Sequence, residues 1–97
     1  MFRSVIEHRL REVQGRLVRA RAELAVIDEQ LGQINDEADD ARIRALVAET
    51  PISEREWTET SRHRDAALRN RRATAETIAE LERRRDDLLH RLPSRVS

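Results

Sequence analysis

The sequence predicts an all-α protein in which two long helices form an antiparallel two-helix coiled-coil hairpin. Three observations lead to this fold class. Charged residues make up 39% of the 97 residues and aromatic residues only 2%, a composition typical of long helices. Apolar residues recur in alternating steps of four and three over the first half of the chain. Near the middle, Thr50-Pro51 interrupts the helical pattern, and a second helical segment follows.

The first helix is expected at about residues 3–49. Its apolar line continues over nearly six heptads, which indicates pairing with another helix along a seam. The line consists of Ile6, Leu10, Val13, Leu17, Ala20, Leu24, Ile27, Leu31, Ile34, Ala38, Ala41 and Ala45. At roughly 1.5 Å per residue this helix is about 70 Å long, so only a partner helix could keep it ordered. Whether it kinks near Asn35 stays open.

The turn is expected at residues 50–53, immediately after the first helix. Ser53 and Glu56 have the spacing of a capping box, in which Ser53 caps the amide of Glu56 and Glu56 reaches back. Ile52 and Trp57 have the spacing of a hydrophobic staple around this cap. Together with Pro51, these residues predict a tight reversal at the tip of the hairpin.

The second helix is expected at about residues 54–92, followed by a short tail at 93–97. Its apolar line is thinner than that of the first helix, because Arg64, Arg71 and Arg85 occupy positions where seam residues are expected. Such arginines can lay their aliphatic stems on the core and extend their guanidinium groups to acids. For Arg64 and Arg71 we expect the acids to be Asp28, Asp36 or Asp39 of the first helix.

A reversal near Pro51 brings together residues whose numbers sum to about 103. Leu88 then faces Val13 and Leu17, and Leu68 faces Ile34. Charge agrees with this register, because residues 22–41 contain seven acids and no base, and they lie opposite the arginines of residues 62–72. The predicted intrachain seam comprises Leu10, Val13, Leu17, Leu24, Ile27, Leu31, Ile34, Leu68, Ile78, Leu81, Leu88 and Leu92. Residues 1–97 are expected to form one domain.

A second stripe of small residues runs along the first helix, roughly opposite the seam. It consists of Gly15, Val18, Ala22, Ala25 and Gly32. The stripe is nearly symmetric about residue 23 or 24, and the charges change sign near the same point, because residues 1–21 carry six arginines and two glutamates whereas residues 22–41 are acidic. We expect two copies to pair through this stripe into a four-helix homodimer. Antiparallel pairing suits the charges, while a parallel dimer or a higher oligomer stays open.

Composition excludes several functional classes. The net charge is zero and cysteine is absent, so there is no bulk attraction to nucleic acid, no thiolate metal site and no cysteine nucleophile. No signal peptide and no run of 18 apolar residues occurs, so a cytoplasmic protein is expected. His8, His63 and His90 each have a carboxylate on their own helical face, which predicts surface pairs and not a metal site. We expect no cofactor and no enzymatic activity.

Two functional alternatives remain beside a non-catalytic scaffold or adaptor that self-associates and presents its tip to an unidentified protein. Arg83-Arg84-Arg85 and the arginines of residues 62–72 favour a nucleic-acid-binding arm, which in outline resembles the coiled-coil arm of seryl-tRNA synthetases. Asp86 and Asp87 and the lack of aromatic residues for base stacking argue against it. The acidic and apolar tip resembles in outline the helical hairpin of transcript-cleavage factors, which regulate from inside a polymerase channel.

Overall fold

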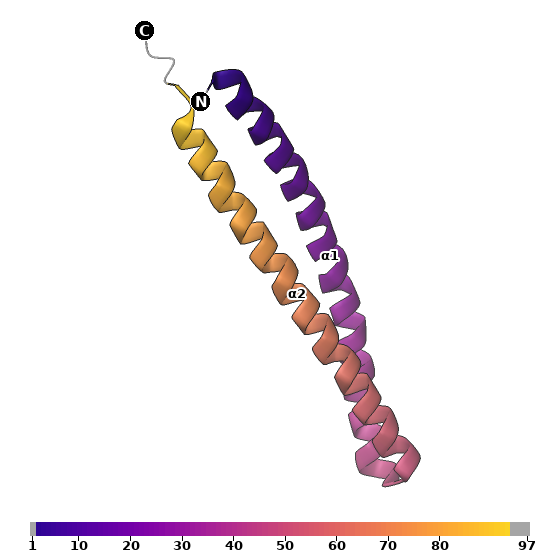
Figure 1. Cartoon of the computed structure of the whole chain (residues 1–97). Helices are drawn as coiled ribbons and strands as arrows, with labels where there is room; N and C mark the ends of the chain where they lie inside the picture. The colour runs from indigo at the N-terminus through magenta and orange to yellow at the C-terminus, as the bar shows by residue number, and fades with distance from the viewer. Residues whose placement is uncertain (1, 94–97) are drawn as a thin grey trace.

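The structure, a computed structural model, describes residues 2–93 and consists of two helices. Helix α1 spans Arg3–Ala48 and helix α2 spans Pro51–Arg91, with only Glu49 and Thr50 between them. The helices pack antiparallel along their length, so the start of α1 and the end of α2 share one end of the molecule, which we call the open end (Figure 1). The all-α antiparallel hairpin predicted from the heptad line is therefore confirmed.

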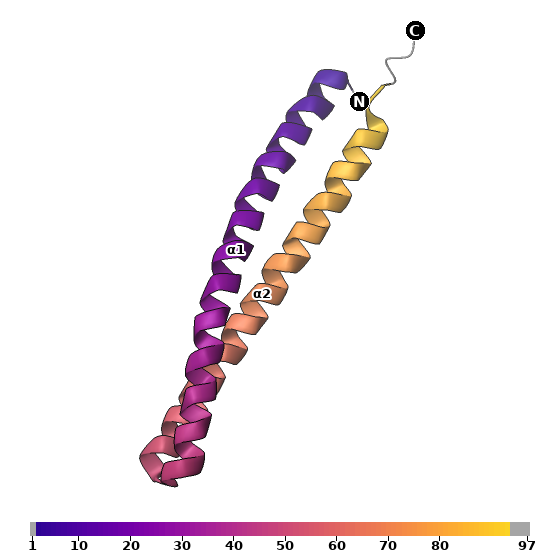
Figure 2. The same cartoon turned by 180° about the vertical axis from the view of Figure 1, so that it is seen from behind.

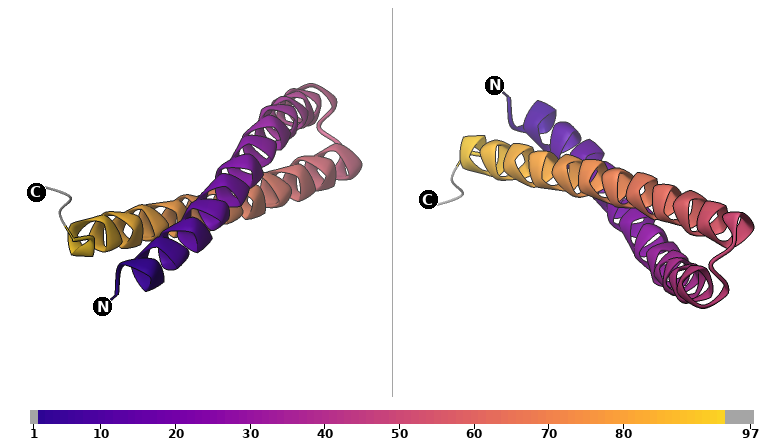
Figure 3. Two further views of the ribbon diagram at one scale, coloured as in Figure 1. Left: turned by 90° about the horizontal axis from the view of Figure 1, so that it is seen from above. Right: turned by 90° about the horizontal axis from the view of Figure 1, so that it is seen from below.

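The molecule is a thin rod. Its principal extents are 75 × 16 × 16 Å, and its radius of gyration is 21.5 Å, against about 12.5 Å for a compact domain of this length. The helices remain neighbours when the rod is viewed from behind (Figure 2), and they cross when it is viewed along its length (Figure 3). Such crossing is what the heptad repeat imposes on two paired helices.

Helix α1 runs without a break through Gly15, Gly32 and Asn35. At its start Phe2 provides no side-chain cap. It ends at Glu49, whose backbone is left-handed at φ 51° and ψ 39° and whose N–H donates to the carbonyl of Ala45 at 3.1 Å. Left-handed backbone is a common way to end a helix, and glycine is the residue that adopts it at least cost.

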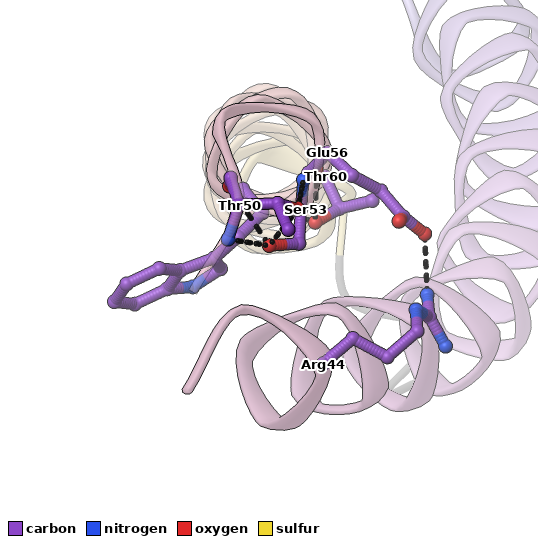
Figure 4. A network of polar contacts seen from close by, with 6 residues as sticks. Arg44, Thr50, Ser53, Glu56 and Thr60 are labelled. Atoms are coloured by element: carbon purple, nitrogen blue, oxygen red, sulfur yellow. Dashed lines mark hydrogen bonds and ion pairs between the residues drawn. The ribbon is translucent and has the colours of Figure 1, made fainter. Parts of the chain in front are cut away.

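Helix α2 begins three residues earlier than the sequence predicted, and the predicted capping box is wrong. Thr50 is the N-cap, and its hydroxyl accepts a hydrogen bond from the Ser53 amide at 3.2 Å, while Ser53 Oγ accepts one from the Thr50 amide at 3.2 Å (Figure 4). Pro51 takes the first helical position, where its missing N–H costs nothing. Glu56 bonds Arg44 instead of closing a box. Ile52 is 78% exposed, so the staple with Trp57 is also wrong.

The seam is built differently in its two halves. Towards the open end it holds large aliphatic residues, with Leu10, Ile78 and Leu92 packed around the buried cluster. The buried cluster is Ile6, Val13, Leu17, Ala20, Leu81 and Leu88. Ile27 and Leu31 are buried further along α1. Towards the tip the buried residues are small, namely Ala38, Ala41 and Ala45 on α1 and Ser53 on α2.

One predicted seam residue lies outside the buried interface. Leu68 is 43% exposed, while its neighbour Ala67 is half-buried. Counting back in sevens from Leu88 and Leu81 leads to Thr74 and Ala67, so the heptad of α2 places Ala67 on the seam and Leu68 beside it. Thr74 is buried and was not predicted as a seam residue. Leu24 and Ile34 of α1 are half-buried.

Candidate interaction surfaces

Within residues 21–82, three ion pairs connect the two helices at intervals along the rod. Arg71 donates from Nε to Asp28 Oδ1 at 2.5 Å and from Nη2 to Oδ2 at 3.4 Å, as the acid-against-arginine register predicted. Arg21 lies 3.6 Å from Glu82, and Arg44 bonds Glu56 near the turn (Figure 4). These side chains are largely exposed, so they fix register and orientation more than they add stability.

Two of these pairs shift the pKa of their arginine. The hydrogen bond to Glu56 raises the pKa of Arg44, and the hydrogen bond to Asp28 raises the pKa of Arg71. Arginine is already charged at ordinary pH, so a raised pKa leaves its state unchanged. We therefore assign both pairs a role in alignment of the helices.

The predicted partner of Arg64 is wrong, and Arg85 pairs in the same local way. Arg64 lies 3.8 Å from Asp65, and Arg85 donates to Asp86 at 3.1 Å, so both pair within α2 and neither reaches the acids of α1. Each of these arginines is followed directly in the sequence by an aspartate, so a carboxylate is available without crossing the seam. Both side chains are half-buried, as expected for stems that lie along the edge of the core.

The side of α1 that points away from α2 is the most unusual surface of the rod, and we call it the outward face of α1. It comprises the three heptad positions that lie farthest from the two seam positions. Six large hydrophobic residues of α1 are exposed, from 38% at Val5 to 80% at Val47, and all six lie on this face. They are Val5, Val18, Val26, Ile43, Leu46 and Val47.

The predicted small-residue stripe lies along the middle of the same face. Val18, Ala22, Ala25 and Gly32 are exposed, and Gly15 is half-buried. A Cβ atom at Gly32 would meet nothing, and one at Gly15 would meet only Arg19 Nη1 at an ordinary 3.5 Å. Neither glycine has a positive φ. The hairpin alone therefore gives no reason for two glycines that each cost about 1 kcal/mol relative to alanine in a helix.

Helix α2 presents the opposite chemistry on its own outward side. Between Arg55 and His90 that side carries charged residues, threonine and alanine, and no large aliphatic residue. The exposed Leu68 and Leu89 each directly follow a seam residue and so lie at the edge of the seam. The two long faces of the rod thus differ: one is apolar in places, and the other is solvated throughout.

The tip, which we define as residues 43–57, carries the second concentration of exposed aliphatic side chains. Ile43, Leu46, Val47 and Ile52 are between 52% and 80% exposed, whereas Trp57 is half-buried. The turn itself is held by the reciprocal hydrogen bonds of Thr50 and Ser53 (Figure 4). Small residues therefore fill the interior of the tip while its larger aliphatic residues face outward.

The described residues were also compared with the arrangement that a metal site requires. No three His, Cys, Asp or Glu side chains in this range gather closely enough to hold a metal ion. A groove of about 490 Å³ lies open between the helices and is lined mostly by amide, carboxylate and alanine side chains together with His63. Such a groove does not exclude water from a substrate.

The two helices were searched for membrane spans, and the sequence was compared with known proteins. Neither α1 nor α2, as far as the structure describes them, has a stretch long and apolar enough to cross a membrane. No protein-family model matches the sequence, and searches of curated proteins and of solved structures give no significant match. The surfaces of the rod are therefore the features that point to a function.

Proposed function

We propose that this chain is a non-catalytic protein–protein interaction module, a scaffold or adaptor that self-associates as a homodimer through the outward face of α1. In this four-helix assembly α1 lies inside and α2 outside. One observation carries the proposal: all six exposed large hydrophobic residues of α1 lie on its outward face, whereas the outward side of α2 is polar between Arg55 and His90. Concentrated exposed apolar surface is typical of interaction sites.

The energetics of the single hairpin support the same proposal. The chain exposes 7359 Å², against about 5,700 Å² for a compact monomer of this mass. Among residues 2–93, four of the eleven buried hydrophobic residues are alanines, which contribute little apolar area. A standard interface removes about 800 Å² from each partner. Pairing along α1 would supply the apolar burial that the narrow seam lacks.

The experiment compares charge insertions on the two outward faces. Val18→Glu with Val26→Glu places two acids on the outward face of α1, and Ala66→Glu with Ala73→Glu places the same two acids on exposed positions of α2. By sedimentation equilibrium we expect the wild type and the α2 variant to have twice the 11.3 kDa chain mass, and the α1 variant to have the mass of one chain. A monomeric wild type at high micromolar concentration would refute the proposal.

A second candidate contact is the tip, where we propose that a different protein binds. The supporting observation is the group of four exposed aliphatic residues within ten positions around the turn, next to the exposed Glu49 and Glu54. Ile52 separates this contact from the dimer because it belongs to α2. Ile52→Glu should abolish capture of a tip-binding protein while the chain stays dimeric. If the wild type and the Ile52→Glu variant capture the tip-binding protein equally, the tip contact is ruled out.

A further inference from the structure

We propose that the two copies pack antiparallel along the outward face of α1, in a register that brings together residues whose numbers sum to 47. This inference rests on the dimer proposed above and adds its orientation and the contacts at its ends. The observations that carry it are the exposed side chains of α1 and the order of charges along them.

The outward face contains its own heptad line, parallel to the seam with α2. The line runs in alternating steps of four and three through Ser4, His8, Arg11, Gly15, Val18, Ala22, Ala25, Glu29, Gly32, Asp36, Asp39 and Ile43. Read in the reverse direction, it superimposes on itself when paired numbers sum to 47. Ala22 of one copy then faces Ala25 of the other, and Gly15 faces Gly32. The smallest residues meet each other, which lets the two helices approach closely.

Charge distinguishes this orientation from the parallel one. In the antiparallel register Arg11 faces Asp36 of the other copy, and His8 faces Asp39. In a parallel dimer in register, Asp36 and Asp39 would each face the same acid, and Arg11 would face Arg11. Like charges opposite each other in a coiled coil disfavour that pairing. Arg11, Asp36 and Asp39 are exposed and form no ion pair with the described residues of their own chain, so they are available to a second copy.

The same register joins the tip of each copy to the open end of the other. Ile43 faces Ser4 of the other copy, and Val5 faces Arg42. Ile43 is 52% exposed and Val5 is 38% exposed in the single chain, and the exposed Phe2 lies at the same end as Val5. The dimer therefore covers Ile43 at the tip, while Ile52 on α2 remains outside.

Spin-label distances test the orientation, and the absence of native cysteine makes single labels specific. The labels are placed at the edge of the face, in Glu23→Cys near its centre and in Asp40→Cys near the tip. In the antiparallel register the two residues 40 are separated by about 50 Å along the axis, at 1.5 Å per residue, whereas the two residues 23 are neighbours. In a parallel dimer both label pairs are close, at about the helix–helix spacing of 8–10 Å plus the linkers. A short distance at residue 40 would overturn the orientation.

A charge exchange gives an independent readout. Arg11→Asp and Asp36→Arg should each weaken dimerisation by roughly fivefold because each creates two like-charge contacts in the antiparallel dimer. The double variant should regain the wild-type dissociation constant because both pairs are restored with their signs exchanged. In a parallel dimer the single variants would change nothing, which would refute the register. A monomeric wild type would refute the dimer itself, whereas a dimer with a short distance at residue 40 would refute only the orientation.

Discussion

At the scale of single residues, the turn holds the clearest strain in the described chain. Glu49 is the one non-glycine residue with a positive φ among residues 2–93, and its side chain raises the energy of that backbone. Glu49→Gly should therefore raise the free energy of unfolding by about 0.5–1 kcal/mol, after the greater freedom of glycine in the unfolded chain is subtracted. Urea denaturation at fixed protein concentration measures the change.

The matched control is the same substitution in the first turn of α2. Glu54 lies inside the helix, where glycine is unfavourable, so Glu54→Gly should lower the free energy of unfolding by about 1 kcal/mol. If Glu49→Gly also lowers the free energy of unfolding, the left-handed backbone assigned to Glu49 at the end of α1 is wrong.

The N-cap of α2 gives a second residue-scale prediction. Thr50→Ala removes the hydroxyl that accepts from the Ser53 amide, so it should cost about 1 kcal/mol, whereas Thr50→Ser should retain most of the stability. Glu56→Ala should cost less than Thr50→Ala, because Glu56 pairs with an exposed arginine and does not cap the helix. A larger loss for Glu56→Ala would instead favour a cap at Ser53. Thermal unfolding followed by circular dichroism at 222 nm orders the three variants.

At the scale of the helices, two leucines of α2 differ in position: one lies on the seam and the other lies at its edge. Leu81 is 6% exposed within the main buried cluster, and Leu68 is 43% exposed. Leu81→Ala should cost about 2–5 kcal/mol because it leaves a cavity between the helices. Leu68→Ala should cost about 1 kcal/mol or less. Chemical denaturation of both variants checks the register, and equal losses would place Leu68 on the seam.

Helix α1 and its seam follow directly from the sequence because large apolar residues mark nearly every heptad position up to Ile34. The seam of α2 was harder to predict where it passes through small and polar residues. Between the neighbours Ala67 and Leu68, size favoured the leucine, but the repeat set by Leu81 and Leu88 places Ala67 inward. Thr74 was missed for the same reason: a buried threonine gives no hydrophobic signal.

The turn shows how two overlapping signals compete. Thr50 with Ser53 and Ser53 with Glu56 both have capping-box spacing, three residues apart. Glutamate at the third helical position favoured the later box, but Pro51 is best placed at the first helical position, and the residue before it is extended. The proline therefore starts α2 instead of preceding it.

The outward face of α1 was also only partly predictable. The stripe from Gly15 to Gly32 is visible in the sequence as small residues at heptad spacing. The exposure of Val26, Leu46 and Val47 became evident only when the position of α2 was known, because a valine in a long helix is equally compatible with a seam edge. Periodicity identifies which faces are apolar, and the fold shows which of them stays uncovered.

At the scale of the whole molecule, the rod is too thin to bury its own apolar surface. Its helices share one seam, and the remaining large aliphatic residues of α1 point outward. An antiparallel dimer doubles the mass and thickens the rod, but it barely lengthens it, because the centre of the register lies only about two residues from the middle of α1.

Small-angle X-ray scattering with an absolute mass tests this account most directly, since one curve gives both mass and length. We predict twice the 11.3 kDa chain mass together with a maximum dimension of about 80 Å, the 75 Å rod plus the small offset of the two copies. The mass of a single chain, or a doubled mass with a dimension near twice that of the rod, would contradict side-by-side pairing through α1.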